Sequence, residues 1–274
     1  MKNYLLPVLE NYYEEILSIE SKLRMSKSLI EIGAKKIKEG QKERMIFEAI
    51  TCFRDISLIG AEENLFTPDY SYSVNLSTLD EEVEKIMNER CCYAVSQCYE
   101  ALENYFVEIL TEYLFFNQEK LLELKLIENQ TPLIRVEIRD IIKRNQKINN
   151  KGLIHTVRKL SDHFRDFEYR NIYGVSITQW FDLISMIRHT LVHNRKVISP
   201  SFLNYINEQK ANLMFDRFFK RKQIGKSICI YIEMDRASEL INWLNTFSHF
   251  IFKSLSLSLG LKINIQEYNP YRNL

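Results

Sequence analysis

The chain has 274 residues, of which 46% are hydrophobic and 27% charged, so it can bury a sizeable core in one large domain or two small ones. Its formal net charge of +1 excludes a global basic field that would draw in nucleic acid, so any RNA contact must come from a local patch. The 7 glycines and 5 prolines leave little turn chemistry and favour a mostly helical fold.

Cysteine usage and hydropathy indicate the compartment. The five cysteines form no CxxC pair and have no histidine at zinc-finger spacing, and scattered thiols in odd number are typical of a reduced, cytoplasmic protein. Residues 1–7 lack the long apolar core of a signal peptide. The most apolar late stretch, 247–261, is interrupted by His249 and Lys253 and falls short of a membrane span. We therefore expect a cytoplasmic protein with no membrane partner.

The first part of the chain, residues 1–66, shows two apolar patterns of helical period. In residues 5–19 and again in residues 43–59, apolar side chains recur every three or four positions. Residues 64–75 then contain Pro68 and several Asn, Asp and Ser residues, which favour a linker. We expect residues 1–66 to form an N-terminal helical extension that carries no chemistry.

Residues 77–260 predict a helical domain. Ser77 is expected to cap a long helix, since its hydroxyl can accept from free backbone amides and the acidic residues 80–82 suit the positive end of the helix dipole. The expected helices are 78–116, 119–128, 131–146, 153–168, a helix with its apolar face at 177–191, 201–219, and a closing helix to about 259 capped by Asp235 or Ser238. Alternation of Ile228, Ile230 and Ile232 with other residues predicts one small β-hairpin. Residues 261–274 are expected to form an irregular tail.

One segment, residues 186–196 (MIRHTLVHNRK), carries groups suited to catalysis. It places Arg188 and His193 five positions apart at the end of an apolar helical run. An arginine is permanently charged and fork-shaped and binds phosphate, whereas a histidine can take and return a proton near neutral pH. Together they are the minimum set of groups for cleaving RNA without a metal, so we expect both to be catalytic residues.

This segment resembles the signature of the HEPN superfamily, in which an arginine and a polar residue directly after it precede a histidine, with four to six residues between the arginine and the histidine. Arg188, His189 and His193 fit this signature at the four-residue spacing. The helix order over 78–260 is also similar to the HEPN bundle, with extra helices at 119–148 and 201–219. The resemblance implies an all-α, HEPN-like helical bundle with an N-terminal helical extension and one small β-hairpin.

The resemblance also implies a metal-independent endoribonuclease. His193 would act as general base or acid toward the ribose 2′-OH and the leaving 5′-oxygen. Arg188 would hold the scissile phosphate and stabilise the charge of the pentacoordinate state. Because the 2′-OH is the nucleophile, DNA should be inert and the product should end in a 2′,3′-cyclic phosphate. No metal and no cofactor is expected.

Side chains near the motif are candidates for supporting roles. His189, four residues before His193 on the same helix face, is a supporting candidate, and Asn194 is expected to orient the imidazole or the phosphate. Glu100 and Glu103 on the long helix are candidates for orienting the motif arginine. The candidate RNA-binding residues are Arg195, Lys196, Lys220, Arg221, Lys222 and Lys226.

Partners follow from the geometry and from the resemblance. Five steps along an α-helix turn through about 140° and rise about 7.5 Å, so one chain is expected to hold Arg188 and His193 apart unless the helix end bends. HEPN nucleases dimerise, which implies a homodimer with a composite site between two motif helices. Many act as microbial toxins or in phage defence, so RNA and a regulatory or antitoxin protein are expected partners. Arg195 stands where toxins silenced by a nucleotidyltransferase have the modified tyrosine, so that control is not expected.

Other interpretations stay open. A catalytically inactive HEPN-like scaffold would use the same cleft as an RNA or protein interaction module. Alternatively, Arg188 and His193 would form a buried ion pair or a cap at the helix C-terminus, where the dipole favours cations. A metal site is disfavoured: His189 and His193 have zincin spacing, but Thr190 stands where that motif has glutamate, and no third ligand is evident.

Overall fold

The computed structural model describes residues 2–40, 45–55, 57, 64–129, 132–148, 151–208 and 211–263. These residues are mostly helical and include two two-stranded antiparallel sheets. The prediction of a mostly helical fold is confirmed, whereas the HEPN-like architecture stays a prediction. No helix in the described ranges is long and apolar enough to cross a membrane.

The described helices range from 5 to 38 residues in length. The helices are α1 (Leu6–Gly40), α2 (Leu79–Phe116), α3 (Glu119–Glu123), α4 (Arg135–Ile148), α5 (Lys151–Leu160), α6 (Asp162–Phe167), α7 (Ile177–His193), α8 (Pro200–Asn207), α9 (Ala211–Phe218) and α10 (Met234–Ser258). The strands are β1 (Met45–Ile50), β2 (Ser71–Asn75), β3 (Lys220–Ile224) and β4 (Ser227–Tyr231).

The chain forms two compact units, and α1 and α2 each pass from one unit into the other. Unit 1 consists of Met1–Ser21 and Cys91–Leu274, and unit 2 consists of Lys22–Arg90. The Arg188–His193 segment therefore belongs to unit 1. The predicted sequence boundaries near residues 66 and 77 stay a prediction.

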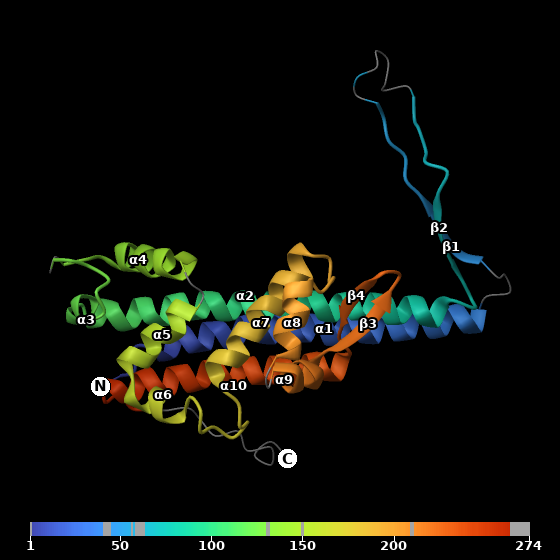
Figure 1. The fold of residues 1–274 in the computed structure, drawn as a ribbon. Coiled ribbons are helices and arrows are strands. Elements are labelled where there is room, and N and C mark those ends of the chain that lie inside the picture. Colours follow the sequence, from blue (N-terminus) through green and yellow to red (C-terminus); the bar gives the residue numbers. More distant parts are fainter. Residues whose placement is uncertain are drawn as a thin grey trace. The chain divides into compact units, whose positions relative to one another are not determined.

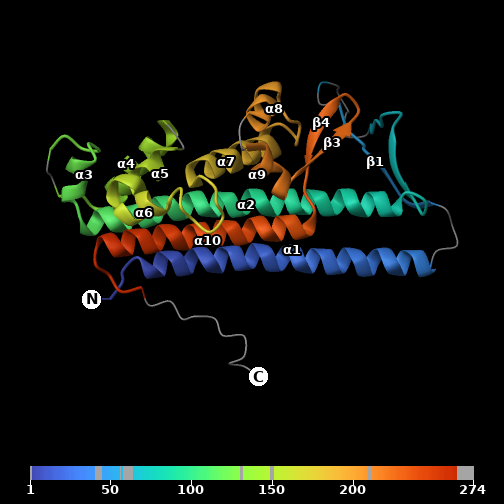
Figure 2. The same cartoon turned by 60° about the horizontal axis from the view of Figure 1, so that its bottom comes forward.

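Three helical segments run side by side in unit 1: the first part of α1, the second part of α2, and α10 (Figures 1 and 2). Phe106 of α2 lies in their core and contacts Phe181 of α7 and Phe247 of α10, with ring centroids 5.6 Å apart in each pair. Cys98 is buried on the same helix, and burial raises the pKa of its thiol to about 12. This core fixes the position of α7 on α2.

Serine side chains set the start of three helices in unit 1. The hydroxyls of Ser161, Ser176 and Ser199 each accept a hydrogen bond from the backbone N–H three residues later, at the starts of α6, α7 and α8. Ser161 thereby divides the helix predicted at 153–168 into α5 and α6. The apolar period continues across this break, so periodicity alone could not locate it.

The prediction of a helix at residues 43–59 is wrong. Its first part is β1, which pairs antiparallel with β2 in the segment expected to be a linker, placing Phe47 opposite Val74. A short apolar run fits both a helical and a strand period, and only the distant partner strand decides between them. Residues 56 and 58–59 lie outside the described ranges. The predicted β-hairpin is present as β3–β4, so the described residues contain two ribbons in place of one.

Several predicted helix boundaries need smaller corrections. The closing helix begins at Met234, directly after Glu233, so neither Asp235 nor Ser238 is its cap. The helix predicted at 119–128 ends early because Lys125 adopts a left-handed backbone with φ of 58°. The helix expected at 201–219 is divided into α8 and α9, and the one expected at 131–146 begins at Arg135. Thr131 and most of the predicted tail, residues 264–274, lie outside the described ranges.

A buried carboxylate ties α5, α6 and α7 together. Glu168, 1% exposed, follows α6 and accepts hydrogen bonds from Nε and Nη2 of Arg158 on α5 at 2.7 and 2.5 Å. Thr178 in the first turn of α7 donates its hydroxyl to the same carboxylate. These contacts raise the pKa of Arg158, chiefly through the hydrogen bonds to Glu168. The start of the motif helix is thus anchored by a satisfied buried charge.

Replacing Arg158 with alanine should lower the free energy of unfolding by about 3 kcal/mol, because it leaves the Glu168 carboxylate buried without its cation. Urea titration followed by circular dichroism measures this change. Lys120→Ala is the matched control, since its ion pair with Glu123 is exposed and should contribute less than about 1 kcal/mol. Equal losses in the two variants would contradict the anchoring role of Glu168.

Candidate functional site

The motif helix α7 separates an apolar inner side from an exposed polar end. Trp180, Phe181, Ile184 and Ile187 are buried. The same helical period turns the last polar residues of α7 outward, so His189 and His193 are exposed and Arg188 is half-buried. The apolar pattern of the sequence therefore positions the motif at the surface of unit 1.

Arg188 is held between two side chains. Its Nη2 donates a hydrogen bond to Oε1 of Glu100 on α2 at 2.7 Å, and its Nη1 lies 3.4 Å from Nε2 of His193. The expectation that one chain holds Arg188 and His193 apart is therefore wrong, because the long arginine side chain spans the helical turn between them. The predicted contact of Glu100 with Arg188 is confirmed. The Nε of Arg188 is buried and has no hydrogen-bond partner among the residues that the structure describes.

The α2 surface under this pair contains a buried phenol. Tyr99 precedes Glu100 and packs against Phe181 of α7 with ring centroids 5.6 Å apart. Burial raises the pKa of Tyr99, and the negative charge of Glu103 raises it further, while Ser185 and Arg188 lower it. Tyr99 is therefore neutral near physiological pH. No sequence signal singles out Tyr99, because its position matches one more core residue of the long helix.

The backbone turns sharply after His193. Arg195 and Lys196 have φ of 50° and 69°. These values lie in the left-handed region, which residues other than glycine, asparagine and aspartate seldom adopt. The amides of Asn194 and Lys196 both donate to the carbonyl oxygen of Thr190, at 3.2 and 3.1 Å. This closes the C-terminus of α7 and directs the following chain to β4, where Ile198 donates its amide to the carbonyl of residue 228 at 2.8 Å.

The extended segment that follows the motif pairs with β4. The β3–β4 hairpin therefore lies beside the end of the motif. Its predicted RNA-binding cations differ in their availability. Lys220 pairs with Glu233 at 2.5 Å and Arg221 with Asp216 at 3.1 Å, so carboxylates already neutralise both. Lys222 lies over the ring of Tyr231, 5.0 Å from its centroid.

The remaining predicted cations are exposed or partly exposed. Arg195, in the turn after the motif, and Lys226, in the tip of the hairpin, are exposed, and neither has a carboxylate partner within the part of the chain that the structure describes. Lys196 is half-buried and engaged in a further contact. Of the predicted set, Arg195 and Lys226 are thus the most available to a phosphate.

A hollow of about 380 Å³ lies beside His189, between α7 and α8. Its lining residues are Ser185, Met186, His189, Thr190, Asn194, Ser199, Ser201 and Phe202. The rings of His189 and His193 lie side by side, with centroids 4.9 Å apart, so the hollow adjoins the Arg188–His193 pair. Most of these lining groups carry hydroxyl, amide or imidazole functions. The sequence assigned no role to α8, which supplies one wall.

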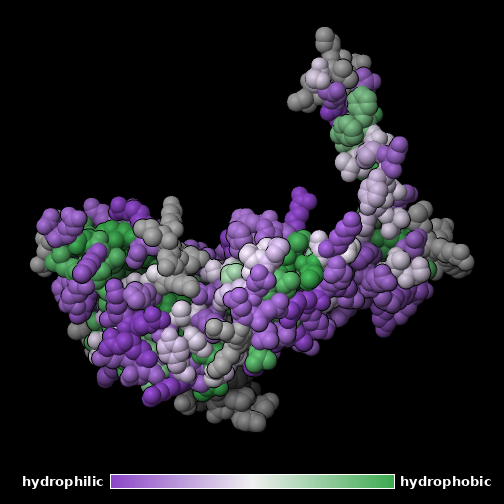
Figure 3. All heavy atoms as spheres, viewed as in Figure 1, coloured by the Kyte–Doolittle hydropathy of each residue, from purple (hydrophilic) through white to green (hydrophobic). Residues whose placement is uncertain are grey.

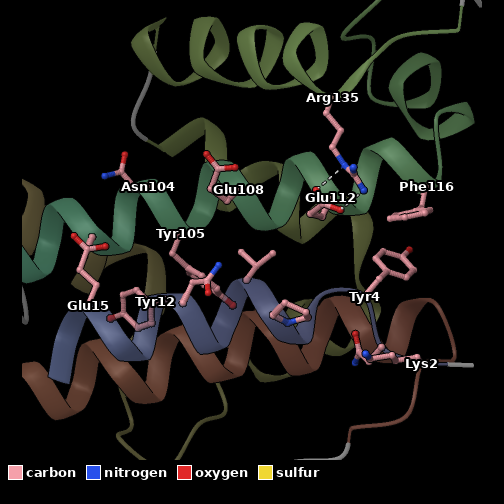
Figure 4. A pocket seen from close by; sticks show the side chains of 15 residues that line it. Lys2, Tyr4, Tyr12, Glu15, Asn104, Tyr105, Glu108, Glu112, Phe116 and Arg135 are labelled. Carbon is pink, nitrogen blue, oxygen red and sulfur yellow. Dashed lines mark hydrogen bonds and ion pairs between the residues drawn. The ribbon is translucent and has the colours of Figure 1, made fainter. Parts of the chain in front are cut away.

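A larger hollow of about 650 Å³ lies between the first part of α1 and the second part of α2. Figure 4 shows Arg135 reaching from α4 toward Glu112, to which its Nε is paired at 2.8 Å. Glu108 in the same wall pairs with Arg139 at 2.6 Å. None of the predicted site residues lines this hollow, and two of its carboxylates are already neutralised.

Comparisons with known proteins give no guide to the site: no family model, no curated protein and no solved structure matches the chain. Within the described ranges, no group of three or more His, Cys, Asp or Glu side chains is placed to hold a metal ion. The functional assignment therefore depends on the arrangement of Arg188, His193 and Glu100.

The exposure of the pair predicts that it contributes little to stability. Arg188→Ala and His193→Ala should each lower the free energy of unfolding by no more than about 1 kcal/mol, because the ion pair of Arg188 with Glu100 is partly solvated. Ile187→Ala, on the buried side of the same helix, should cost about 2–5 kcal/mol. Thermal and urea unfolding of the three variants measure the difference. Losses for Arg188→Ala and His193→Ala as large as that of Ile187→Ala would favour a structural role for the pair.

Proposed function

We propose that this chain is a metal-independent endoribonuclease that cleaves RNA by attack of the ribose 2′-OH, with Arg188 and His193 as its catalytic residues. The observation that carries this proposal is the contact of the Arg188 guanidinium with the His193 imidazole at the exposed end of α7, 3.4 Å apart. A fixed cation for phosphate and a proton-transfer group lie within reach of one phosphodiester. The resemblance of the segment to the HEPN signature supports the same chemistry.

Each residue has a distinct step. Arg188, oriented by Glu100, would bind the non-bridging phosphate oxygens and stabilise the charge that grows in the pentacoordinate state. His193 would accept the proton of the 2′-OH or donate one to the leaving 5′-oxygen. The 2′-oxygen to phosphorus bond forms as the 5′-oxygen to phosphorus bond breaks, which leaves a 2′,3′-cyclic phosphate and a 5′-OH.

This chemistry also favours two protomers. The attacking and leaving oxygens stand on opposite sides of phosphorus, and each needs a proton-transfer group within about 3 Å. The rings of His189 and His193 lie side by side at 4.9 Å, so they are poorly placed to serve the two opposite oxygens. A second motif helix facing the first would supply the missing group. We therefore include in the proposal a homodimer with a composite site.

The surroundings offer places for the rest of the RNA. The hollow beside His189 is near the lower end of the size range of small-ligand pockets, about 300–1,000 Å³, and its polar walls suit one nucleotide next to the cleaved bond. Asn194 lines it, and Arg195 and Lys226 are available to flanking phosphates. The setting that we propose is the cytoplasm of a microbe, in phage defence or as a toxin, with a regulatory or antitoxin protein as a further partner.

Purified protein incubated with total RNA and a tRNA pool in EDTA should cut RNA, with product ends that carry a 2′,3′-cyclic phosphate. His193→Ala should lower the rate at least about a hundredfold, since a positioned acid or base contributes that much. Arg188→Lys should lower it about tenfold or more, because a lysine keeps the charge but loses the fork. His155→Ala, a change to another exposed histidine, should cut like the wild type.

Two results would change the assignment. Cleavage that EDTA abolishes would exclude the metal-free mechanism. Intact RNA with a folded, dimeric wild-type protein would favour the alternative, a catalytically inactive helical scaffold that binds RNA or protein through the same surface. A substrate with a single 2′-deoxy residue at a mapped cut site should resist cleavage there, and its cleavage would exclude 2′-OH attack.

A further inference from the structure

One segment of unit 1 is far more basic than the rest of the chain. Residues 143–159 contain six Lys or Arg and no Asp or Glu, whereas the formal net charge of the whole chain is +1. Subtracting these six charges leaves a formal net charge of −5 on all the other residues. A local excess of cations in an otherwise acidic chain creates a positive potential at one place, and such a place attracts polyanions.

The fold neutralises one of the four cations of this segment whose side chains the structure describes. Arg158 is paired with the buried Glu168. Lys143, Arg144 and Lys159 have no carboxylate partner among the described residues. Arg144 donates its Nε to a backbone carbonyl one turn earlier in α4 at 3.3 Å, and this contact leaves its charge unneutralised. Arg144 and Lys159 are exposed and Lys143 is half-buried, so all three are accessible to a ligand.

These three cations lie on two helices that adjoin each other and the motif helix. The end of α4 approaches the start of α5 so closely that a Cβ on Gly152 would lie 3.4 Å from the carbonyl oxygen of Asn145. Figure 2 shows α4 and α5 on the same side of α2 as α7. In the view of Figure 3, mainly hydrophilic side chains cover α5. We call the region defined by Lys143, Arg144 and Lys159 the α4–α5 surface.

The apolar residues of α5 argue against a lipid or a protein as the ligand of this surface. Leu153, Ile154 and Val157 are at most 1% exposed and belong to the core, so none of them is free to insert into a membrane. No large hydrophobic side chain described within residues 143–159 is exposed, so the apolar anchor of a protein interface is also missing. Cations without exposed apolar neighbours suit a phosphate backbone, whose binding is mainly electrostatic.

Helix α5 also determines how far this surface lies from the candidate catalytic pair. Arg158 of α5 donates its Nη2 to the hydroxyl of Thr178 at 2.8 Å, in the first turn of α7. Arg188 follows Thr178 by ten residues, which is about 15 Å along the helix axis at 1.5 Å per residue. An RNA that reaches both places must therefore extend several nucleotides beyond the cleaved bond.

We propose that the α4–α5 surface is a second RNA-binding site, which holds the phosphate backbone of the substrate at a distance from the cleaved bond. Lys143, Arg144 and Lys159 neutralise phosphates there and release their counterions. The choice of RNA rests on the proposed function, and the substrate class becomes an RNA chain long enough to span both sites. His155 is on the same helix but has no permanent charge, so the site does not include it.

Binding to an RNA that cannot be cleaved tests the surface apart from catalysis. A single-stranded 2′-O-methyl RNA of about 20 nucleotides, longer than typical single-strand sites, lacks the nucleophile, and fluorescence anisotropy measures its binding. Lys143→Ala, Arg144→Ala, Lys159→Ala should weaken binding at least about tenfold. The slope of log K against log salt should also fall in magnitude by about 2, since each lost phosphate contact of a single strand contributes about 0.7.

Two further variants separate local charge from total charge and from folding. Lys22→Ala, Lys35→Ala, Lys36→Ala removes the same charge from exposed lysines of α1 and should bind like the wild type. Lys143→Arg, Arg144→Lys, Lys159→Arg keeps the charge of the α4–α5 surface and should keep the binding. Circular dichroism confirms that each variant is folded. If the protein cleaves RNA, the alanine variant should raise KM for long RNA about tenfold with kcat unchanged.

The possible results are distinct from those that test cleavage. A wild type that binds no RNA, an alanine variant that binds like the wild type, or an equal loss in the α1 control would each overturn the proposal. Loss of binding to phosphatidylserine vesicles without loss of RNA binding would assign the surface to a membrane instead. RNA binding that depends on the α4–α5 surface in a protein that cuts no RNA would support this site and contradict only the proposed catalytic function.

Discussion

Phe181 of α7 packs against Tyr99 and Phe106 of α2, and Phe106 in turn contacts Phe247 of α10. This aromatic contact sets the distance between α2 and α7. Glu100 follows Tyr99 by one position, and Arg188 follows Phe181 by two turns of α7, so the contact places both where their side chains meet at 2.7 Å. The polar pair at the surface thus depends on the apolar contact beneath it.

The same dependence explains how the buried ion pair of Arg158 and Glu168 serves the motif helix. It lies at the opposite end of α7, where Thr178 shares the Glu168 carboxylate. One end of α7 is fixed by a satisfied buried charge, and the other by the turn that joins β4. The Arg188–His193 pair therefore lies on a helix held at both ends, which suits a site that must keep its geometry.

The long elements could be predicted from the sequence, because their apolar period extends over many turns and their first residues have capping chemistry. α2 begins within two residues of the predicted cap Ser77, and α7 begins at Ile177, where the apolar period starts. β1 could not be predicted, because its short apolar run fits a helix and a strand alike and its partner strand β2 lies more than twenty residues away. The break at Ser161 was missed for a related reason: the serine hydroxyl caps α6 without disturbing the apolar period.

The candidate site, like the fold, could be predicted from the sequence only in part. The residue types at 188 and 193 identified the pair, and the expectation that the long helix packs on α7 named Glu100 and Glu103 as candidates; Glu100 pairs with Arg188. The contact of Arg188 with His193 within one chain was not expected, because helical angles locate Cα atoms and ignore the reach of an arginine side chain. The neutralised cations Lys220 and Arg221 show the converse error: a basic cluster in the sequence says nothing of the carboxylates at Glu233 and Asp216 that fold beside it.

The left-handed turn at Arg195 and Lys196 also bears on how this protein trades stability for side-chain placement. Glycine adopts such φ values without steric cost, whereas other residues lose roughly 1–2 kcal/mol at each position. The chain nevertheless carries two long cations there, directly after the motif histidine. A chain selected for stability alone would have glycine at one of these positions, so the turn is a place where the fold accepts backbone strain and gains positive charge beside His193.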